Sequence, residues 1–309
     1  MEKVLITGCS GFLASYLVNE LNDKSSKILG ITEEEHYSSN DFEVIHTDIR
    51  DKDMLGKIVG EFSPDRIYHL AAISNVGFSW KYPGLTYEVN FIGSSNLLEA
   101  VSENSPDARI VLMSSAEVYS IDGDNKLTET SPTSPSNPYA LSKFAMEMAA
   151  DLYINSMNMD IVKIRSFNFT GPGQNTSFVS SDFSYQIAQI EKGRKEPVIK
   201  VGNLSAMRDF SDVRDIARYL TVIGREGKRG EIYNTCSGNV YSISDILNIL
   251  LELSSVRIRI DEESDRFRPV DKPILVGDNS KIKNELGLEP EYNIRMTLAD
   301  ILKHSRNMK

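Results

Sequence analysis

Cysteine, histidine and tryptophan are scarce in this chain. Its 309 residues include 2 cysteines, 4 histidines and 1 tryptophan. Cys9 and Cys236 lie far apart in the sequence, which argues against a disulfide framework and indicates a reducing compartment. The histidines are scattered without the spacing of metal ligands, so we expect no metal site. The single tryptophan, Trp80, is a candidate core residue.

Long apolar runs and internal repeats are also missing. No stretch approaches the ~18 apolar residues that a membrane span needs, and glycine interrupts the first apolar segment too early for a signal peptide. The net charge of -10 argues against nucleic acid or an anionic membrane as a partner. We expect a soluble, cytoplasmic globular protein. The negative net charge still allows an anionic small substrate, provided that positively charged side chains are concentrated at its binding site.

The sequence does contain a tyrosine and a lysine four residues apart, Tyr139 and Lys143, at the start of a predicted helix. Pro138 suits the first helical position, and Ser136 or Asn137 can cap it. The pair shares one helix face. An ammonium about 4 Å from a phenol at an effective dielectric near 20 contributes about 4 kcal/mol, roughly what brings a tyrosine pKa near neutrality. Alone, the pair is equally compatible with two unrelated residues on a solvated helix.

The N-terminus reads as a buried strand, a glycine turn and a helix. Gly8 permits the turn, Gly11 lets a phosphate approach, and Ala14 replaces a third glycine where helix meets sheet. This order predicts that backbone amides at a helix start hold a dinucleotide pyrophosphate. A plain strand-to-helix turn is the alternative. The predicted contacts are Gly8, Ser10, Gly11, Phe12 and Leu13.

The next strands predict the rest of the dinucleotide site. Glu33 follows the second strand, where a carboxylate suits the ribose hydroxyls of NAD and repels the phosphate of NADP. We therefore expect NAD(P)H with a preference for NADH, although an acidic triplet is also typical of a solvated loop. Asp48 and Ile49 are predicted to face the adenine, with Asp48 equally suited to cap a helix. At the end of the fourth strand, room for the cofactor is predicted beside Leu70, Ala71 and Ala72.

Polar side chains end the fifth predicted strand, residues 109–119. Ser115 and Glu117 are two apart, so both can face one ligand in the crevice at the strand end. The polar and aromatic loop 73–80 follows the fourth strand at the same edge and supplies Ser74 and Ser79. The sequence thus brings three candidate groups, Ser115, Tyr139 and Lys143, to consecutive elements.

These patterns predict an α/β protein with a Rossmann-type doubly wound parallel sheet and a smaller C-terminal α/β substrate domain. We assign residues 1–167 and 208–240 to the dinucleotide-binding domain. Residues 168–207 and 241–309 form the substrate domain. Two long helices, from about Pro83 and from Tyr139 to about Met157, carry surplus apolar surface. They indicate a homodimer seam, or alternatively each packs only on the sheet.

Over nearly its whole length the sequence resembles the extended short-chain dehydrogenase/reductase family. The matching motifs are residues 7–14, 69–72, 114–119, 138–143, 165–174 and 208–215. Within that family the downstream half looks most like the GDP-4-keto-6-deoxy-mannose reductases and their relatives, the GDP-mannose 4,6-dehydratases. That likeness is carried by residues 178–183, 201–204, 233–238 and 268–273.

The resemblance implies a role for each site residue. Tyr139 would donate a proton to the sugar 4-keto oxygen, Lys143 would bind the nicotinamide ribose, and Ser115 would orient the ketone. The substrate would be a GDP-linked 4-keto-6-deoxy sugar of deoxysugar biosynthesis, giving a GDP-6-deoxy sugar such as GDP-rhamnose. Arg208 and Arg268 would hold the diphosphate, or form surface salt bridges instead. Further implied substrate contacts are Ser74, Ser79, Asn168, Val179, Asn203 and Asp271.

Two other functions stay open from the sequence. A dehydratase or epimerase would recycle its cofactor, and Glu117 could serve as its base; dehydratases, however, usually carry threonine where this chain has Ser115. That difference favours a reductase. A non-catalytic protein that senses a dinucleotide is the third alternative, since fold does not fix function.

Overall fold

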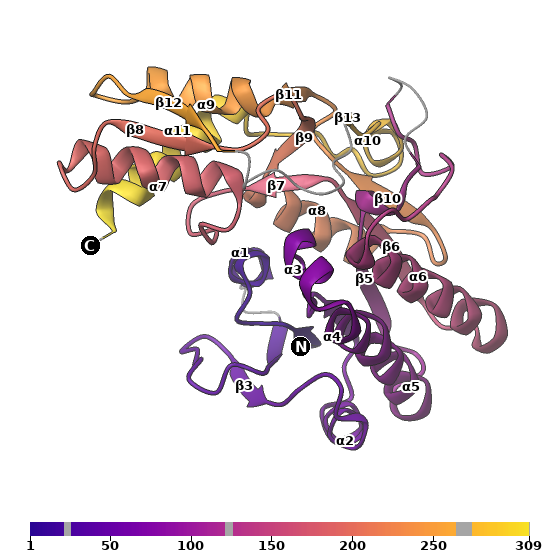
Figure 1. Cartoon of the computed structure of the whole chain (residues 1–309). Helices are drawn as coiled ribbons and strands as arrows, with labels where there is room; N and C mark the ends of the chain where they lie inside the picture. Colours follow the sequence, from indigo (N-terminus) through magenta and orange to yellow (C-terminus); the bar gives the residue numbers. More distant parts are fainter. Residues whose placement is uncertain (22–25, 121–125, 264–273, 309) are drawn as a thin grey trace.

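A parallel sheet of seven strands forms the centre of the larger part of the protein (Figure 1). The computed structural model describes residues 1–21, 26–120, 126–263 and 274–308. Strands β1 and β5 are nearly continuous buried apolar runs, as a parallel sheet covered on both faces requires. In spatial order the strands are β10 (Ile232–Thr235), β6 (Ile161–Ser166), β5 (Arg109–Ser115), β4 (Arg66–His69), β1 (Glu2–Thr7), β2 (Ser26–Thr32) and β3 (Glu43–His46).

The order of the strands reverses between β1 and β4. From β1 the chain proceeds through β2 to β3 in one direction, and from β4 through β5 to β6 in the other. Ligands of such sheets bind in the crevice beyond the carboxyl ends of the strands at this switch point. The doubly wound sheet predicted from the sequence is confirmed, and so is the return of the chain to the sheet at β10, which pairs with β6.

Helices cover both faces of the sheet, and each layer has its own apolar core. One layer consists of α1 (Phe12–Leu21), α8 (Val213–Glu226) and α10 (Ser280–Leu286). The other consists of α2 (Lys52–Phe62), α5 (Ser94–Asn104) and α6 (Pro138–Met157).

The long helix predicted from Pro83 is interrupted. It consists of α4 (Pro83–Tyr87), a π-helical stretch, η1 (Glu88–Gly93), and then α5. Asn90 lies in the π-helical stretch, and its side chain brackets the backbone of Ile73: the amide oxygen accepts from the Ile73 nitrogen at 2.8 Å and the amide nitrogen donates to its carbonyl at 3.0 Å. Such bulges in helices frequently occur at functional sites. The short helix α3 (Val76–Lys81) precedes α4.

A second, smaller part of the chain lies above the seven-stranded sheet in Figure 1 and has a separate apolar core. We propose that it corresponds to the predicted substrate domain. Its helices are α7 (Val179–Glu191), α9 (Ile243–Glu252) and α11 (Ile294–Asn307). Its strands are β7 (Asn168–Thr170), β8 (Val198–Val201), β9 (Met207–Asp212), β11 (Val240–Ser242), β12 (Arg259–Glu262) and β13 (Ile274–Leu275).

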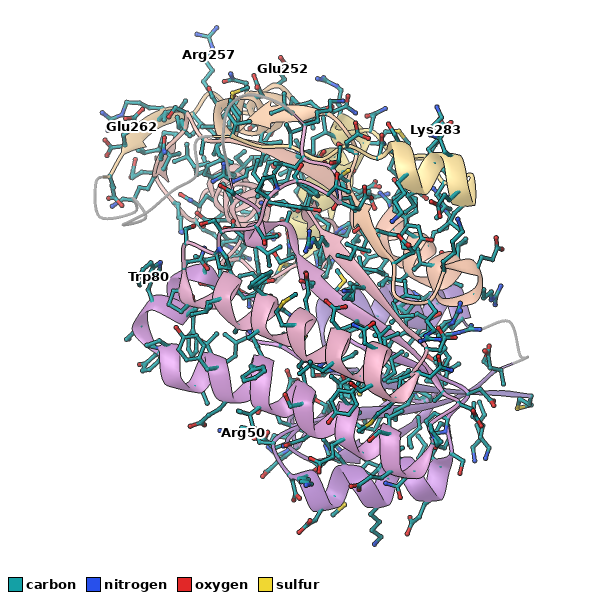
Figure 2. The ribbon with its side chains drawn as sticks, turned by 90° about the vertical axis from the view of Figure 1, so that its right-hand side faces the viewer. Arg50, Trp80, Glu252, Arg257, Glu262 and Lys283 are labelled. Atoms are coloured by element: carbon teal, nitrogen blue, oxygen red, sulfur yellow. The ribbon has the colours of Figure 1, made fainter. Side chains whose placement is uncertain are left out.

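Trp80 is at the surface, where Figure 2 shows it at the edge of the molecule, and it is 42% exposed. Its assignment to the core is therefore wrong, because α3 is a short helix that packs against α4 and α6 and leaves Trp80 facing outward. Both cysteines are buried free thiols. None of the helices in the described part of the chain combines the length and apolar character needed to cross a bilayer. Within those residues, no group of three histidine, cysteine or acidic side chains is placed to hold a metal ion.

Candidate active site

The glycine turn lies at the switch point of the sheet, directly against the end of β4. Gly8 has φ +71°, and a Cβ there would lie 2.8 Å from the backbone nitrogen and Cα of Ala71. Its own amide donates to the Ile31 carbonyl at 2.8 Å, and its carbonyl accepts from the Gly11 amide at 3.0 Å. Only glycine fits both the backbone conformation and the close approach. The turn therefore fits a flat dinucleotide that crosses the strand ends on bare backbone.

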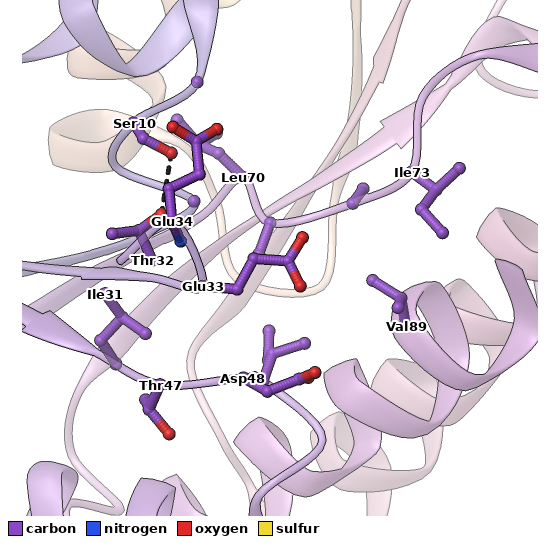
Figure 3. Close-up of a pocket in the computed structure, with 15 residues that line it drawn as sticks. Ser10, Ile31, Thr32, Glu33, Glu34, Thr47, Asp48, Leu70, Ile73 and Val89 are labelled. Carbon is purple, nitrogen blue, oxygen red and sulfur yellow. Dashed lines mark hydrogen bonds between the residues drawn. The ribbon is translucent and has the colours of Figure 1, made fainter. Parts of the chain in front are cut away.

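The adenosine side of the crevice is lined by residues from the glycine turn, the ends of β2 and β3, and the segment after β4 (Figure 3). In Figure 3 the Glu33 side chain points into this space, and Glu34 lies beside Ser10. The Ser10 hydroxyl shares a 2.8 Å hydrogen bond with Thr32. The predicted residues that line this cleft are Gly8, Ser10, Gly11, Glu33, Asp48, Ile49, Leu70, Ala71 and Ala72.

Asp48 meets a cation that the sequence reading did not consider. The Arg50 guanidinium donates to both oxygens of the Asp48 carboxylate, with the shortest contact at 2.5 Å. This hydrogen bonding lowers the pKa of Asp48. Arg50 thus compensates the Asp48 charge, whereas Glu33 forms no ion pair with any of the described residues and adds a negative charge to the cleft.

Tyr139 is placed by the start of α6, as its sequence predicts. Pro138 occupies the first turn, and Asn137 caps the helix by accepting from the Ala140 nitrogen at 2.8 Å. The phenol is 9% exposed and is hydrogen-bonded with Ser115 at the end of β5. Lys143 follows one turn later, and its ammonium donates to the Met113 carbonyl at 2.8 Å. The three residues therefore meet in one place.

The pKa values of the pair correct the sequence argument. Burial raises the pKa of Tyr139 to about 12; the Ser115 hydrogen bond lowers it and the Glu117 charge raises it. Burial also lowers the pKa of Lys143 to about 8, against the opposing charge of Glu147. The predicted lowering of the Tyr139 pKa is wrong, because desolvation dominates and the ammonium is bound to a carbonyl. A phenol that keeps its proton at neutral pH is suited to donate it.

Behind Lys143 lies a buried ion pair that the sequence reading missed. Glu147, one turn along α6, is fully buried and accepts from Arg165 of β6, with a shortest contact of 2.7 Å. The Ser114 hydroxyl also donates to Glu147, and the Arg165 guanidinium lies 4.7 Å from the centre of the Tyr119 ring. The pair fixes α6 against β5 and β6 directly behind the candidate site.

His69 at the end of β4 is a buried neutral side chain. Its Nε2 lies 2.8 Å from the Ser94 hydroxyl, and its Nδ1 lies 2.7 Å from the Thr7 hydroxyl. Since Ser94 already donates its proton to the Asn90 carbonyl at 2.5 Å, Nε2 must carry the histidine proton. Burial, followed by the charge of Lys143, lowers the pKa of His69 to about 3. The ring therefore links β1, β4 and α5 without charge.

The substrate side of the crevice continues from the glycine turn past Tyr139. It has a volume of about 310 Å³, enough for a small organic ligand. The predicted residues found in its lining are Phe12, Leu13, Ser74, Ser115, Glu117, Tyr139, Lys143 and Asn168. Further lining residues that the sequence analysis did not select are Asn75, Gln174, Asn175, Ser177 and Phe178. The last four could have been found from the sequence, because they lie in the Gly- and Ser-containing connection that follows β7.

Other predicted substrate contacts lie elsewhere. Ser79 is fully buried, and its hydroxyl bonds to backbone groups rather than lining the cleft. Arg208 is 4% exposed within β9, where it donates to the Met207 carbonyl at 2.8 Å. Asn203 accepts from Ser205, and Val179 begins α7 directly after Phe178 of the cleft. Their proposed contacts with substrate stay predictions, and Arg268 and Asp271 lie outside the described residues.

The reversed strand order, the glycine turn and the grouping of Ser115, Tyr139 and Lys143 define an extended short-chain dehydrogenase/reductase fold. The family model for GDP-mannose 4,6 dehydratase matches residues 5–301, so the chain belongs to that family. The chain is 29% identical over 304 residues to a GDP-6-deoxy-D-mannose reductase from Pseudomonas aeruginosa, covering 97% of this chain and 96% of the relative.

One further relative and one solved structure are similar to the chain over nearly their whole length. A GDP-6-deoxy-D-talose 4-dehydrogenase from Aggregatibacter actinomycetemcomitans is 30% identical over 305 residues, covering 98% of this chain and 97% of the relative. The structure of RMD from Pseudomonas aeruginosa complexed with NADPH superposes with a TM-score of 0.87 at 26% identity, covering 99% of both chains. These relatives are enzymes, which sets the non-catalytic alternative aside.

Proposed function

We propose that the protein reduces the 4-keto group of a GDP-linked 4-keto-6-deoxy sugar, using a reduced nicotinamide dinucleotide, to give a GDP-6-deoxy sugar. The observation that carries the proposal is the meeting of Ser115, Tyr139 and Lys143 in a cleft continuous with the glycine turn. The relatives from Pseudomonas and Aggregatibacter support the substrate class, because both act on GDP-linked 6-deoxy sugars by name.

The chain's own residues supply binding and proton transfer. The turn at Gly8 would hold the dinucleotide, which when bound supplies a hydride. Tyr139 keeps its proton at neutral pH and gives it to the ketone oxygen, while the Ser115 hydroxyl orients that oxygen. The Lys143 ammonium is charged below a pKa of about 8. Its positive charge would stabilise the phenolate that forms when Tyr139 gives up its proton. Proton transfer by a placed group contributes roughly 10²- to 10⁴-fold.

The start of α7 is the second part of the proposed substrate site. Ser177 and Phe178 line the cleft directly before the helix, and the first amides of a helix lack partners within it. The buried hydroxyls of Ser180 and Ser181 in its first turn have no hydrogen-bond partner within the described residues. We infer that this helix start holds a phosphate of the diphosphate, which favours the positive end of a helix.

The preference for NADH over NADPH rests on Glu33. Its carboxylate in the adenosine cleft would repel a phosphate on the ribose. We expect Glu33→Gln to improve kcat/KM with NADPH about tenfold, which corresponds to ~1.4 kcal/mol of relieved repulsion. Glu35→Gln is the control, since Glu35 is exposed and two residues further along. An unchanged ratio of NADH to NADPH efficiency in the Glu33 variant would refute this preference.

A dehydratase or epimerase is the second candidate, favoured by one observation. Glu117 lines the cleft and accepts from the Asn137 side chain at 3.1 Å, so a carboxylate is held near the substrate. Such an enzyme turns over without net loss of cofactor. Incubation of the protein with GDP-4-keto-6-deoxy-mannose and NADH or NADPH separates the two, because only the reductase consumes the reduced cofactor.

Mutation of Tyr139 and Lys143 tests the site in the same assay. Tyr139→Phe removes the donor, and Lys143→Met removes the charge that supports it. We expect each to lower kcat at least ~100-fold, with the protein still folded by circular dichroism. Retention of full activity in Tyr139→Phe would exclude the proposed role.

We propose a homodimer through α6 and the helices before it. Leu141, Met148 and Leu152 recur at helical spacing along α6 and are 48%, 44% and 68% exposed, and Ile92 of the neighbouring π-helical stretch is 46% exposed. A second copy would cover this stripe by the same surface, as in most two-fold dimers. Light scattering should give twice the chain mass, and Leu152→Glu should give the monomer; a monomeric wild type would refute the seam.

A further inference from the structure

Ser79 connects the wall of the substrate cleft to the backbone of Tyr139. It lies in α3, is fully buried, and donates its hydroxyl proton to the Val76 carbonyl at 2.7 Å. The same oxygen accepts a hydrogen bond from the Tyr139 amide at 3.2 Å, across 60 residues of sequence. Val76 itself lines the cleft.

The Tyr139 amide needs an acceptor from outside its own helix. It lies in the first turn of α6, where amides have no intrahelical carbonyl to bind. Asn137 satisfies only the next amide, that of Ala140. Ser79 is therefore the second cap of α6 and holds the residue that carries the phenol.

The other end of the same loop is attached to the Tyr139 carbonyl. The Ser142 hydroxyl donates to that carbonyl at 2.7 Å and accepts from the Asn90 side chain at 2.9 Å. Asn90 in turn brackets the backbone of Ile73. Within segment 73–79, Ile73 lines the adenosine cleft and residues 74–76 line the substrate cleft. The segment is linked to Tyr139 at both ends, directly through Ser79 and, at Ile73, through Asn90 and Ser142.

We propose that Ser79 is a positioning residue that couples the cleft-lining residues 74–76 to the orientation of Tyr139. The proposal rests on the proposed role of Tyr139 as proton donor. Ser79 is buried outside the lining of the cleft, so in this proposal it acts through the peptide nitrogen of Tyr139. Displacement of that nitrogen turns the phenol away from Ser115 without altering any group that binds the dinucleotide.

Three variants test the coupling by steady-state kinetics and thermal melting. Ser79→Ala removes the acceptor, Ser79→Thr keeps it, and Thr86→Val is the matched control. Thr86 is also fully buried, and within the described residues its hydroxyl donates only to the carbonyl of Tyr82, the N-cap of its own helix α4, at 2.9 Å. Thr86→Val therefore removes a buried hydroxyl without removing a hydrogen bond to α6.

We expect Ser79→Ala to lower kcat by roughly 10- to 100-fold, because small misplacements of catalytic groups cost this much, with an unchanged KM for the dinucleotide. Ser79→Thr should restore most of kcat. Thr86→Val should lower the melting temperature as Ser79→Ala does and leave kcat unchanged. A wild-type kcat in Ser79→Ala, or an equal loss of kcat in Thr86→Val, would overturn the proposal.

Amide exchange gives a readout independent of turnover. The Tyr139 amide should exchange faster with deuterium in Ser79→Ala than in the wild type, and Ser79→Thr should retain protection. Unchanged exchange in Ser79→Ala would contradict the coupling. If the wild type itself shows no turnover of the GDP-linked ketone, the proposed function fails, while exchange still decides whether Ser79 holds Tyr139.

Discussion

Removal of the Glu147 charge is the sharpest perturbation of the region behind the site. Glu147→Gln keeps the size and one oxygen of the side chain but leaves the Arg165 guanidinium, 5% exposed, without its counter-charge. Breaking a buried pair from one side costs about 3–5 kcal/mol. At ~2–4 °C per kcal/mol for a domain of this size or somewhat smaller, the melting temperature should fall by about 10 °C.

The same substitution also changes the proton affinity of Lys143. The Glu147 charge raises the Lys143 pKa against the larger lowering by burial. Without that charge, the Lys143 pKa falls below its present value of about 8. In the wild type, kcat should decrease at alkaline pH as the Lys143 ammonium loses its proton. In the variant this loss occurs at lower pH, so the decrease in kcat should begin at lower pH.

Differential scanning calorimetry and a pH profile of kcat measure both effects. Glu252→Gln is the control, because the Glu252–Arg295 pair is more than half exposed on both sides and exposed pairs contribute little. A Glu147→Gln protein that melts with the wild type and has the same alkaline limb would refute the reasoning about this pair.

Two other predictions concern the glycine turn and the buried histidine. Gly8→Ala should weaken NADH binding at least ~10-fold in a fluorescence titration, because it adds left-handed backbone strain and a clash with Ala71. Gly193→Ala is the control and should bind NADH normally, because Gly193 also has a positive φ of +67° but has open space around it. Equal NADH affinities of the two variants would contradict the role of the glycine turn in binding the dinucleotide. Burial lowers the pKa of His69 to about 3. Between that value and about 6.5, His69 is protonated in the unfolded chain but not in the folded chain. The free energy of unfolding therefore falls as the pH falls through this window, by up to ~1.4 kcal/mol per pH unit. His69→Gln should flatten this acid limb in urea unfolding, and an unchanged slope would count against a neutral His69.

Local patterns in the sequence were sufficient for the sheet, the glycine turn and the start of α6. The cap at Asn137 and the strand end at Ser115 follow from residues within a few positions of one another. The doubly wound strand order followed from the alternation of strands and helices together with the family resemblance.

Contacts between distant segments escaped the sequence analysis. The bond from Ser79 to Tyr139 spans 60 residues, and the pair of Arg165 with Glu147 joins a strand to a helix. No periodicity encodes such partners, so nothing in the sequence pointed to the bond between Ser79 and the Tyr139 backbone. The pKa of Tyr139 was misjudged for a related reason, because the depth of burial is set by the whole fold rather than by the spacing to Lys143.

The central claim is that hydride passes to the sugar ketone while Tyr139 supplies the proton. The most direct measurement uses NADH with both hydrogens of the reactive nicotinamide carbon replaced by deuterium, GDP-4-keto-6-deoxy-mannose as substrate, and NMR of the product. We expect deuterium bound to C4 of a GDP-6-deoxy sugar, with one NADH consumed per sugar reduced. Product without deuterium at C4, or turnover without NADH consumption, would contradict it.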